Sequence, residues 1–207
     1  MHRLTTLDIV STLAAVALLT GAGVRAQTKP PAPRTSTTFT CAADLGAGVA
    51  SKRRFCDVVI ASVPAESVSI SIPPRTGTAT LQFDLHNRFQ VPPAGADVAE
   101  SFARHTAVVA VVRPTGEVID RAVAARDYRT PTDLFDRIAG TGRGAPPKAV
   151  APGAPLAVRV TIPPGVNLVG IVGARLEEWR MAGRAAFDTP GRPIAMVSNV
   201  RVEYRPR

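Results

Sequence analysis

The sequence predicts an all-β protein, an antiparallel β-sandwich with one or two short helices and a long Gly/Pro loop. Several short segments alternate apolar and polar residues, which is the pattern of half-buried strands. Proline and glycine, 19 and 16 of the 207 residues, recur between these segments at turn positions. Helical periodicity is confined to short stretches, so strands must supply the hydrophobic core.

Residues 1–26 have the features of a signal peptide. A short basic start precedes an apolar run over 9–19, and Val24-Arg25-Ala26 has the small-x-small character of a signal-peptidase site. The run is shorter than the roughly 20 residues that a membrane-spanning helix needs. An N-terminal core helix is the alternative, but a proline-rich segment follows at once. We therefore expect export, cleavage after Ala26, a periplasmic or extracellular location and a mature chain that does not span the membrane.

A Pro/Thr-rich spacer is expected over 27–38, followed by a single domain over 39–207. The sequence contains two cysteines, Cys41 and Cys56. Their spacing does not fit a Cys-x-x-Cys motif, and the chain has too few Cys and His residues for a structural zinc site. In an oxidising compartment we expect a disulfide between them, with two buried free thiols as the alternative. Closing a loop of about 15 residues stabilises the fold by about 3 kcal/mol.

The clearest strand covers 78–91, where polar and apolar residues alternate over the whole length. Asn87 is the one polar residue on the apolar side, which indicates a bulge or the end of the strand there. The apolar side carries Leu81, Phe83, Leu85, Phe89 and Val91, and the other side carries Gln82, Asp84, His86, Arg88 and Gln90.

Other segments complete the predicted sandwich. A short helix is expected over 130–140, because Thr132 or Thr130 could cap it, Leu134, Phe135 and Ile138 form an apolar side, and Gly140 ends it. One helical turn is expected around 98–104. Residues 141–155 are expected to form a long loop, with a domain linker as the alternative, and 177–187 fit either a strand or a helix. Further strands are predicted at 57–61, 67–72, 106–112, 118–125, 156–162, 166–176 and 193–206.

This order of strands and turns is similar to the Ig-like sandwiches that are common in exported bacterial proteins. The similarity concerns the general architecture and rests on no sequence motif.

The formal net charge is +9, which favours attraction to anionic surfaces. The basic residues are scattered, however, and the densest cluster is Lys52-Arg53-Arg54. Aromatic residues are sparse and not interleaved with arginine, so the sequence does not predict specific nucleic-acid binding. No glycine-rich phosphate loop precedes a predicted helix, and no cofactor is expected. A generally positive surface with weak attraction to anionic polymers is the simplest interpretation.

The only catalytic or metal-binding set that the sequence suggests is Asp84, His86 and His105, joined by Asp127 or Glu100. A metal needs three or four converging ligands, and this set would supply them only if the fold brought the two histidines together. Ser101 beside His105 is the one local candidate nucleophile, without a Gly-x-Ser-x-Gly elbow. The face that carries Asp84 and His86 is polar throughout, so we expect it to face water. We therefore assign no catalytic or metal-binding residues.

Glu177 and Glu178 are adjacent and would point to opposite faces of a strand, so they do not form a carboxylate pair. Trp179, the only tryptophan, could stack on a sugar, but a core or edge anchor is the commoner role.

These observations predict an exported, non-catalytic β-sandwich that acts as an envelope-associated or extracellular binding or scaffold module. Its partner would be an unknown protein or an envelope polymer. An unpaired edge strand such as 195–205 would provide a means of joining a partner. The alternative is an exported metal-dependent or serine hydrolase that uses Asp84, His86 and His105.

Overall fold

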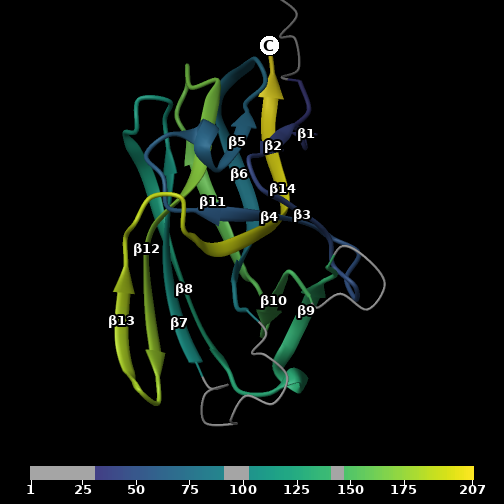
Figure 1. Cartoon of the computed structure of the whole chain (residues 1–207). Coiled ribbons are helices and arrows are strands. Elements are labelled where there is room, and N and C mark those ends of the chain that lie inside the picture. The colour runs from purple at the N-terminus through teal and green to yellow at the C-terminus, as the bar shows by residue number, and fades with distance from the viewer. Residues whose placement is uncertain (1–30, 91–102, 141–146) are drawn as a thin grey trace, which may run out of the picture. The chain divides into compact units, whose positions relative to one another are not determined.

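The computed structural model describes residues 31–90, 103–140 and 147–207, and they form an all-β sandwich (Figure 1). This confirms the predicted fold class. One sheet, called sheet A, has the order β11-β6-β14-β4-β3, with β1 paired to β14. Its strands are β1 (Arg34–Ser36), β3 (Asp44–Ala47), β4 (Arg54–Val59), β6 (Arg75–Asn87), β11 (Leu156–Ile162) and β14 (Pro193–Pro206).

The second sheet, called sheet B, has the order β2-β5-β12-β7-β8, with β13 paired to β12. A separate two-stranded β9–β10 ribbon and two single 3-10 turns, η1 (Pro64–Glu66) and η2 (Pro131–Asp133), complete the described part of the chain. The remaining strands are β2 (Phe39–Cys41), β5 (Val68–Ser71), β7 (Ala103–Val112), β8 (Val118–Tyr128), β9 (Leu134–Ile138), β10 (Ala149–Pro152), β12 (Leu168–Arg180) and β13 (Gly183–Phe187).

The main hydrophobic core lies between the inner faces of the two sheets. Alternate residues of each strand point inward, as the sequence pattern predicted, because side chains of a strand alternate between the two faces. From sheet A the core receives Leu81, Phe83 and Leu85 of β6, and from sheet B it receives Val169 and Ile171 of β12. β6 ends at Asn87, which confirms the expectation that the strand ends or bulges at this residue.

The Cys41–Cys56 disulfide joins the two sheets. Cys41 ends β2 in sheet B, Cys56 lies within β4 in sheet A, and their Cα atoms are 5.6 Å apart. The predicted pairing is therefore confirmed. The bond is a covalent link across the sandwich and not only the closure of a local loop.

Strand pairing begins inside the segment that we predicted as a spacer. Arg34–Ser36 form β1, whose residues pair antiparallel with Tyr204–Val202 of β14. The folded body thus includes part of 27–38. Within β14, β4 pairs only with residues 193–197, and β1 pairs with the C-terminal part of the same edge. The predicted signal peptide and the cleavage site after Ala26 lie outside the described residues.

The predicted helix over 130–140 is wrong. Thr130 does cap a turn, in a capping box with Asp133, but only the single turn η2 follows, and the chain then continues as β9. β9 pairs with β10 (Ala149–Pro152), which lies within the segment predicted as a loop. Pairing with β10 satisfies the backbone N–H and C=O groups of Leu134–Ile138, so a helix is not needed to satisfy them.

Two other expectations are settled by the described residues. The ambiguous segment 177–187 is a strand on both sides of a turn, because β12 runs on to Arg180 and β13 returns from Gly183. β14 is not an edge strand, since it pairs with β6 on one side and with β4 and β1 on the other. The expected helical turn at 98–104 lies mostly outside the described residues, and Ala103 and Arg104 already belong to β7.

In the described part of the chain, no helix has the length and apolar character needed to cross a membrane.

Candidate functional site

Most of the polar face that we predicted to be solvent-exposed on β6 is covered, so the prediction is wrong there, and of its residues only Gln90, beyond the end of the strand, is exposed. Gln82 is 4% exposed and His86 2% exposed, while Asp84 is half-buried. The cover over His86 is the β9–β10 ribbon, which packs against sheet A through a second apolar cluster. This cluster consists of Leu45, Phe55, Ile138, Ala149, Ala151 and Met196, with Phe135 at its margin.

His86 lies inside this covered layer as a neutral side chain. Its Nε2 atom is 2.9 Å from Ser198 Oγ, and the rings of Phe55 and Phe135 lie 5.1 and 5.3 Å from the imidazole. Burial lowers the pKa of His86 to about 4, although the negative charge of Asp84 acts in the opposite direction. A serine next to a histidine suggests a nucleophile and its base. Ser198 is itself fully buried, however, so this pair is closed to a substrate.

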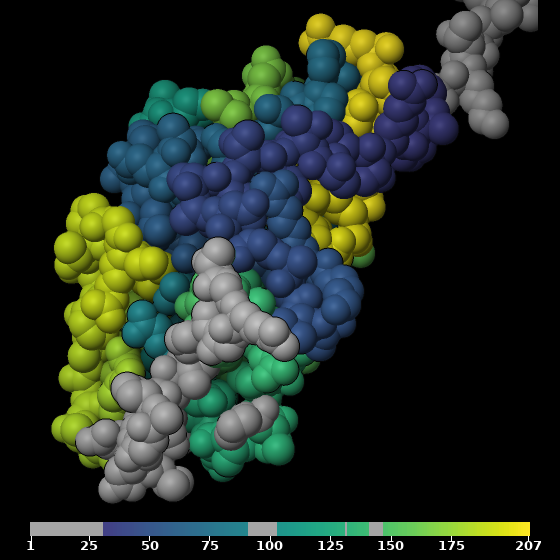
Figure 2. Space-filling view, turned by 45° about the vertical axis from the view of Figure 1, so that its right-hand side comes forward, coloured from purple at the N-terminus to yellow at the C-terminus, as the bar shows by residue number. Residues whose placement is uncertain are grey.

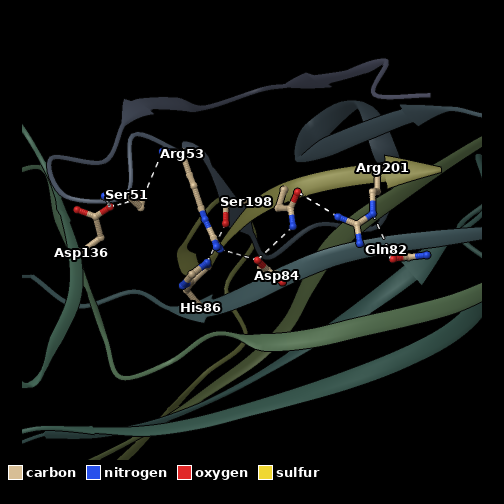
Figure 3. Close-up of polar contacts among 9 residues, drawn as sticks. Ser51, Arg53, Gln82, Asp84, His86, Asp136, Ser198 and Arg201 are labelled. Atoms are coloured by element: carbon tan, nitrogen blue, oxygen red, sulfur yellow. Dashed lines mark hydrogen bonds and ion pairs between the residues drawn. The ribbon is translucent and has the colours of Figure 1, made fainter. Parts of the chain in front are cut away.

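The neighbouring polar side chains are used within the protein (Figure 3). Asp84 accepts a hydrogen bond from Arg53 Nη1 at 2.6 Å. Arg201 donates to Gln82 Oε1 from two nitrogen atoms, at 2.8 and 3.2 Å. The row of polar residues that the sequence placed on this face is therefore a structural network between β6, β14 and the segment before β4.

Asp136 of β9 anchors the segment that covers this network. Its carboxylate accepts hydrogen bonds from the backbone N–H groups of Ala50 and Ser51, each at 2.9 Å, and a close one from the Ser51 hydroxyl. Burial alone would raise the pKa of Asp136, but the hydrogen bonds from Ser51, Ala50 and Arg137 outweigh this effect and lower it. The carboxylate is thus ionised in the folded protein and holds residues 50 and 51 against β9.

Replacing Asp136 with asparagine is expected to lower the free energy of unfolding by about 1.5–3 kcal/mol, because hydrogen bonds to a charged acceptor are lost or weakened in a buried position. Urea unfolding at pH 7 measures this loss. Asp120→Asn is the matched control, since Asp120 is exposed on β8 and its side chain accepts only from the adjacent Arg121 backbone. Equal stability of the two variants would contradict the anchoring role.

His105 occupies a different place, on β7 of sheet B. Its ring stacks on Phe89 with a centroid distance of 3.8 Å, its Nδ1 lies 3.1 Å from the Arg88 carbonyl oxygen, and its Nε2 lies 3.3 Å from Glu178 Oε1. His86 and His105 therefore have separate partners on separate sheets.

The other members of the predicted catalytic set do not complete it. Asp127 pairs with Arg104 and Arg129, whereas Glu100 and Ser101 lie outside the described residues. Over the ranges that the structure describes, no group of three or more His, Cys, Asp or Glu side chains converges to hold a metal.

A pocket of about 370 Å³ opens beside His105. It is built from four separate parts of the chain: the end of β6, β7, the outer half of β12 and the turn before β14. Leu176 and Pro193 form its apolar wall, and its polar lining consists of Arg88, Gln90, His105, Glu178, Arg180 and Arg192.

No family model, curated protein or solved structure matches this chain. The site must therefore be interpreted from its own geometry.

The charges in the pocket are partly neutralised. Arg88 Nε is 2.8 Å from Asp57 Oδ1, and both side chains are largely buried. Burial raises the pKa of Asp57, and the Arg88 charge opposes this effect. Arg180 forms a close ion pair with Glu178. Arg192 differs from both, because its guanidinium lies over the Phe187 ring at 3.5 Å from the centroid and has no carboxylate partner among the described residues.

The β12–β13 hairpin next to this pocket exposes large side chains. Trp179 is 46% exposed and Met181 72% exposed, so of the two roles that the sequence favoured, a core or an edge anchor, the core role does not apply to the tryptophan. Arg184 lies over the Trp179 ring at 4.9 Å. Glu177 and Glu178 point to opposite faces, as predicted: Glu177 pairs with Arg184, whereas Glu178 is buried beside His105. Figure 2 shows this yellow-green hairpin along the left-hand margin of the face in view.

Sequence analysis did not find the pocket. Its residues are distant in the sequence and include no motif with a fixed spacing. The one available signal was the pair Glu178 and Arg180, which share a face of one strand two residues apart.

Proposed function

We propose that this protein is an exported, non-catalytic binding or scaffold module of the cell envelope or the extracellular space, and that it joins a partner protein by strand addition to β13. The observation that carries the proposal is the open edge of β13. Gly183–Phe187 pair with β12 on one side, and no described residue pairs with them on the other (Figure 1). Four of the five residues are exposed.

The edge lacks the features that usually prevent strand addition. Natural edge strands are protected by proline, bulges or several charges. β13 contains no proline, pairs with β12 without a register shift, and carries Arg184 as its single charge. β8, another edge strand of sheet B, carries charged residues along its length, and Arg126 ties it to the Ala154 carbonyl oxygen.

The exposed side chains beside β13 support the same surface. Trp179 is on the neighbouring strand directly opposite Arg184, and Met181 is in the turn. Aromatic and methionine side chains are enriched in protein interfaces because they bury a large apolar area. An extended segment added to β13 would form backbone hydrogen bonds along the edge and cover part of this apolar surface.

A proline at Ala186, whose backbone N–H lies on the open edge of β13, tests the proposal. Arg180 and Gly183 flank the two-residue turn and form its closing pair, so by the alternation of an antiparallel ladder the Ala186 N–H points away from β12. We expect Ala186→Pro to abolish partner binding and leave the hairpin intact. Ala186→Ser, which keeps the N–H group, is the matched control.

The assay replaces Arg184 in each variant with a photo-crosslinking residue. Crosslinking is then carried out in the envelope and medium fractions of the producing cells. The mass of the recovered chain also reports cleavage after Ala26. A discrete crosslinked protein in the parent and the Ala186→Ser variant that is missing in Ala186→Pro supports strand addition. A crosslinked product that persists in Ala186→Pro, or crosslinking to a polysaccharide in place of a protein, contradicts it.

A further inference from the structure

The pocket beside His105 contains a buried hydrogen-bond acceptor that lacks a donor. His105 is 6% exposed, and its Nδ1 faces the Arg88 carbonyl oxygen at 3.1 Å. A carbonyl oxygen can only accept, so Nδ1 must carry the hydrogen. In the neutral ring the other nitrogen, Nε2, is then an acceptor.

The nearest polar atom does not satisfy this acceptor. Glu178 Oε1 lies 3.3 Å from Nε2, but the ionised carboxylate is also an acceptor, and Nε2 forms no aligned hydrogen bond. Burial lowers the pKa of His105, although the Glu178 charge opposes this effect, so the neutral ring is favoured. Glu178 is already bonded to Arg180.

The same pocket contains a donor that lacks an acceptor. Arg192 also lines the cavity, and its guanidinium rests on the Phe187 ring without a carboxylate partner in the described ranges. Because Arg88 and Arg180 are each paired with a carboxylate, Arg192 gives the pocket one net positive charge. A ligand that fits must therefore supply both an anionic oxygen and a hydroxyl hydrogen.

We propose that this pocket binds a monoprotonated phosphate group, with an anionic oxygen on Arg192 and the P–OH group donating to His105 Nε2. Inorganic phosphate carries both features throughout the neutral pH range, because it keeps a P–OH group after its second ionisation, and a phosphate monoester carries both below its second pKa of about 6. A carboxylate or a phosphodiester offers an anionic oxygen but no hydrogen at this pH. The site adjoins the hairpin, because Arg192 rests on Phe187 of β13, but it does not use the open edge and does not depend on strand addition.

Binding requires the P–OH hydrogen of the ligand, and the charged groups around His105 determine how binding depends on pH. Glu178 and Arg180 approach from β12, Arg126 lies opposite on β8, and Arg88 and Arg192 lie across the pocket. None of these arginines loses its charge in the accessible pH range. The affinity for a phosphate monoester should therefore fall about tenfold for each pH unit above its second pKa of about 6, because its last hydrogen must be taken up from solvent. Inorganic phosphate keeps one P–OH group above neutral pH, so its affinity should not show this fall.

Isothermal titration of the mature chain with inorganic phosphate and with sulfate tests this proposal. Sulfate has nearly the same size and shape but carries no hydrogen at neutral pH. A site that uses a hydroxyl hydrogen discriminates strongly against an analogue that lacks it. We expect phosphate to bind at least tenfold more tightly than sulfate at pH 6.5. Equal affinities, or no saturable binding of phosphate, would overturn the assignment.

Two variants locate the binding. Arg192→Gln should weaken phosphate binding at least tenfold. Arg159→Gln, which removes the same charge from an exposed position on edge strand β11, should leave it unchanged. Circular dichroism checks that both variants are folded. Equal weakening in both variants would show attraction to the general positive charge and overturn the site. Titration with glycerol 3-phosphate distinguishes the source: tighter binding than inorganic phosphate assigns a phosphate monoester, and equal binding assigns free phosphate.

Discussion

Removing the Cys41–Cys56 disulfide is expected to lower the free energy of unfolding by about 3 kcal/mol, because the bond restricts the unfolded chain by closing a loop of about 15 residues. The bond also holds β2 of sheet B to β4 of sheet A, so its loss affects both layers. Urea unfolding of the Cys41→Ala/Cys56→Ala variant measures the change.

The parent protein unfolded in a reducing agent is the internal control and should agree with the double variant. Agreement between the two would exclude an effect of the alanine side chains. A loss below about 1 kcal/mol in both would contradict the stabilising role of the link.

Lowering the pH from 7.5 to 5 is expected to lower the free energy of unfolding by about 2 kcal/mol through His86 alone. The pKa of this histidine is about 4 in the folded protein, against about 6.5 in the unfolded chain. Below pH 6.5 the unfolded chain therefore binds a proton that the folded protein does not. The stability is fully present above pH 6.5 and is lost progressively down to pH 4.

The paired variant His86→Phe/Ser198→Ala removes the titrating ring and leaves no unpaired hydroxyl. The phenyl ring can occupy the space between Phe55 and Phe135. We expect the variant to lose about 2 kcal/mol less than the parent between pH 7.5 and pH 5, as measured by urea unfolding at both pH values. Burial also lowers the pKa of His105, so a smaller dependence in the same direction should remain. An unchanged dependence would show that His86 does not titrate in this range.

Local patterns predicted much of the sandwich. The alternation of 78–91 reports which residues of β6 face the core, and Asn87 on the apolar side marks where that strand ends. The two cysteines could be paired because the chain offers a single pairing. These features depend on neighbouring residues or on a single choice, and sequence alone contains that information.

Predictions about the outward face of β6 required knowledge of distant segments. A polar side chain in an alternating strand is consistent with water or with a polar network under a cover. The cover here is β9 and β10, which come from residues 134–152 and were expected to be a helix and a loop. A capping threonine and the apolar residues Leu134, Phe135 and Ile138 suggested a helix, but Thr130 caps only one turn. His86 was therefore placed in water when it is almost fully buried.

The pocket residues could not be predicted for a similar reason. Arg88, His105, Glu178 and Arg192 meet only because β6, β7, β12 and β14 converge, and each is an ordinary charged or polar residue in its local sequence. The unpaired state of His105 Nε2 and of the Arg192 guanidinium depends on which other side chains reach them.

The central position of β14 affects how the protein folds. Residues 193–206 separate β6 from β4, and they also hold β1, so sheet A stays in unconnected pieces until this strand arrives. Closing such distant contacts is entropically costly and makes folding slow. During synthesis sheet A cannot be completed until residues 193–206 have left the ribosome. Late completion of sheet A is compatible with the export that we propose, because transport through a narrow channel requires an unfolded chain.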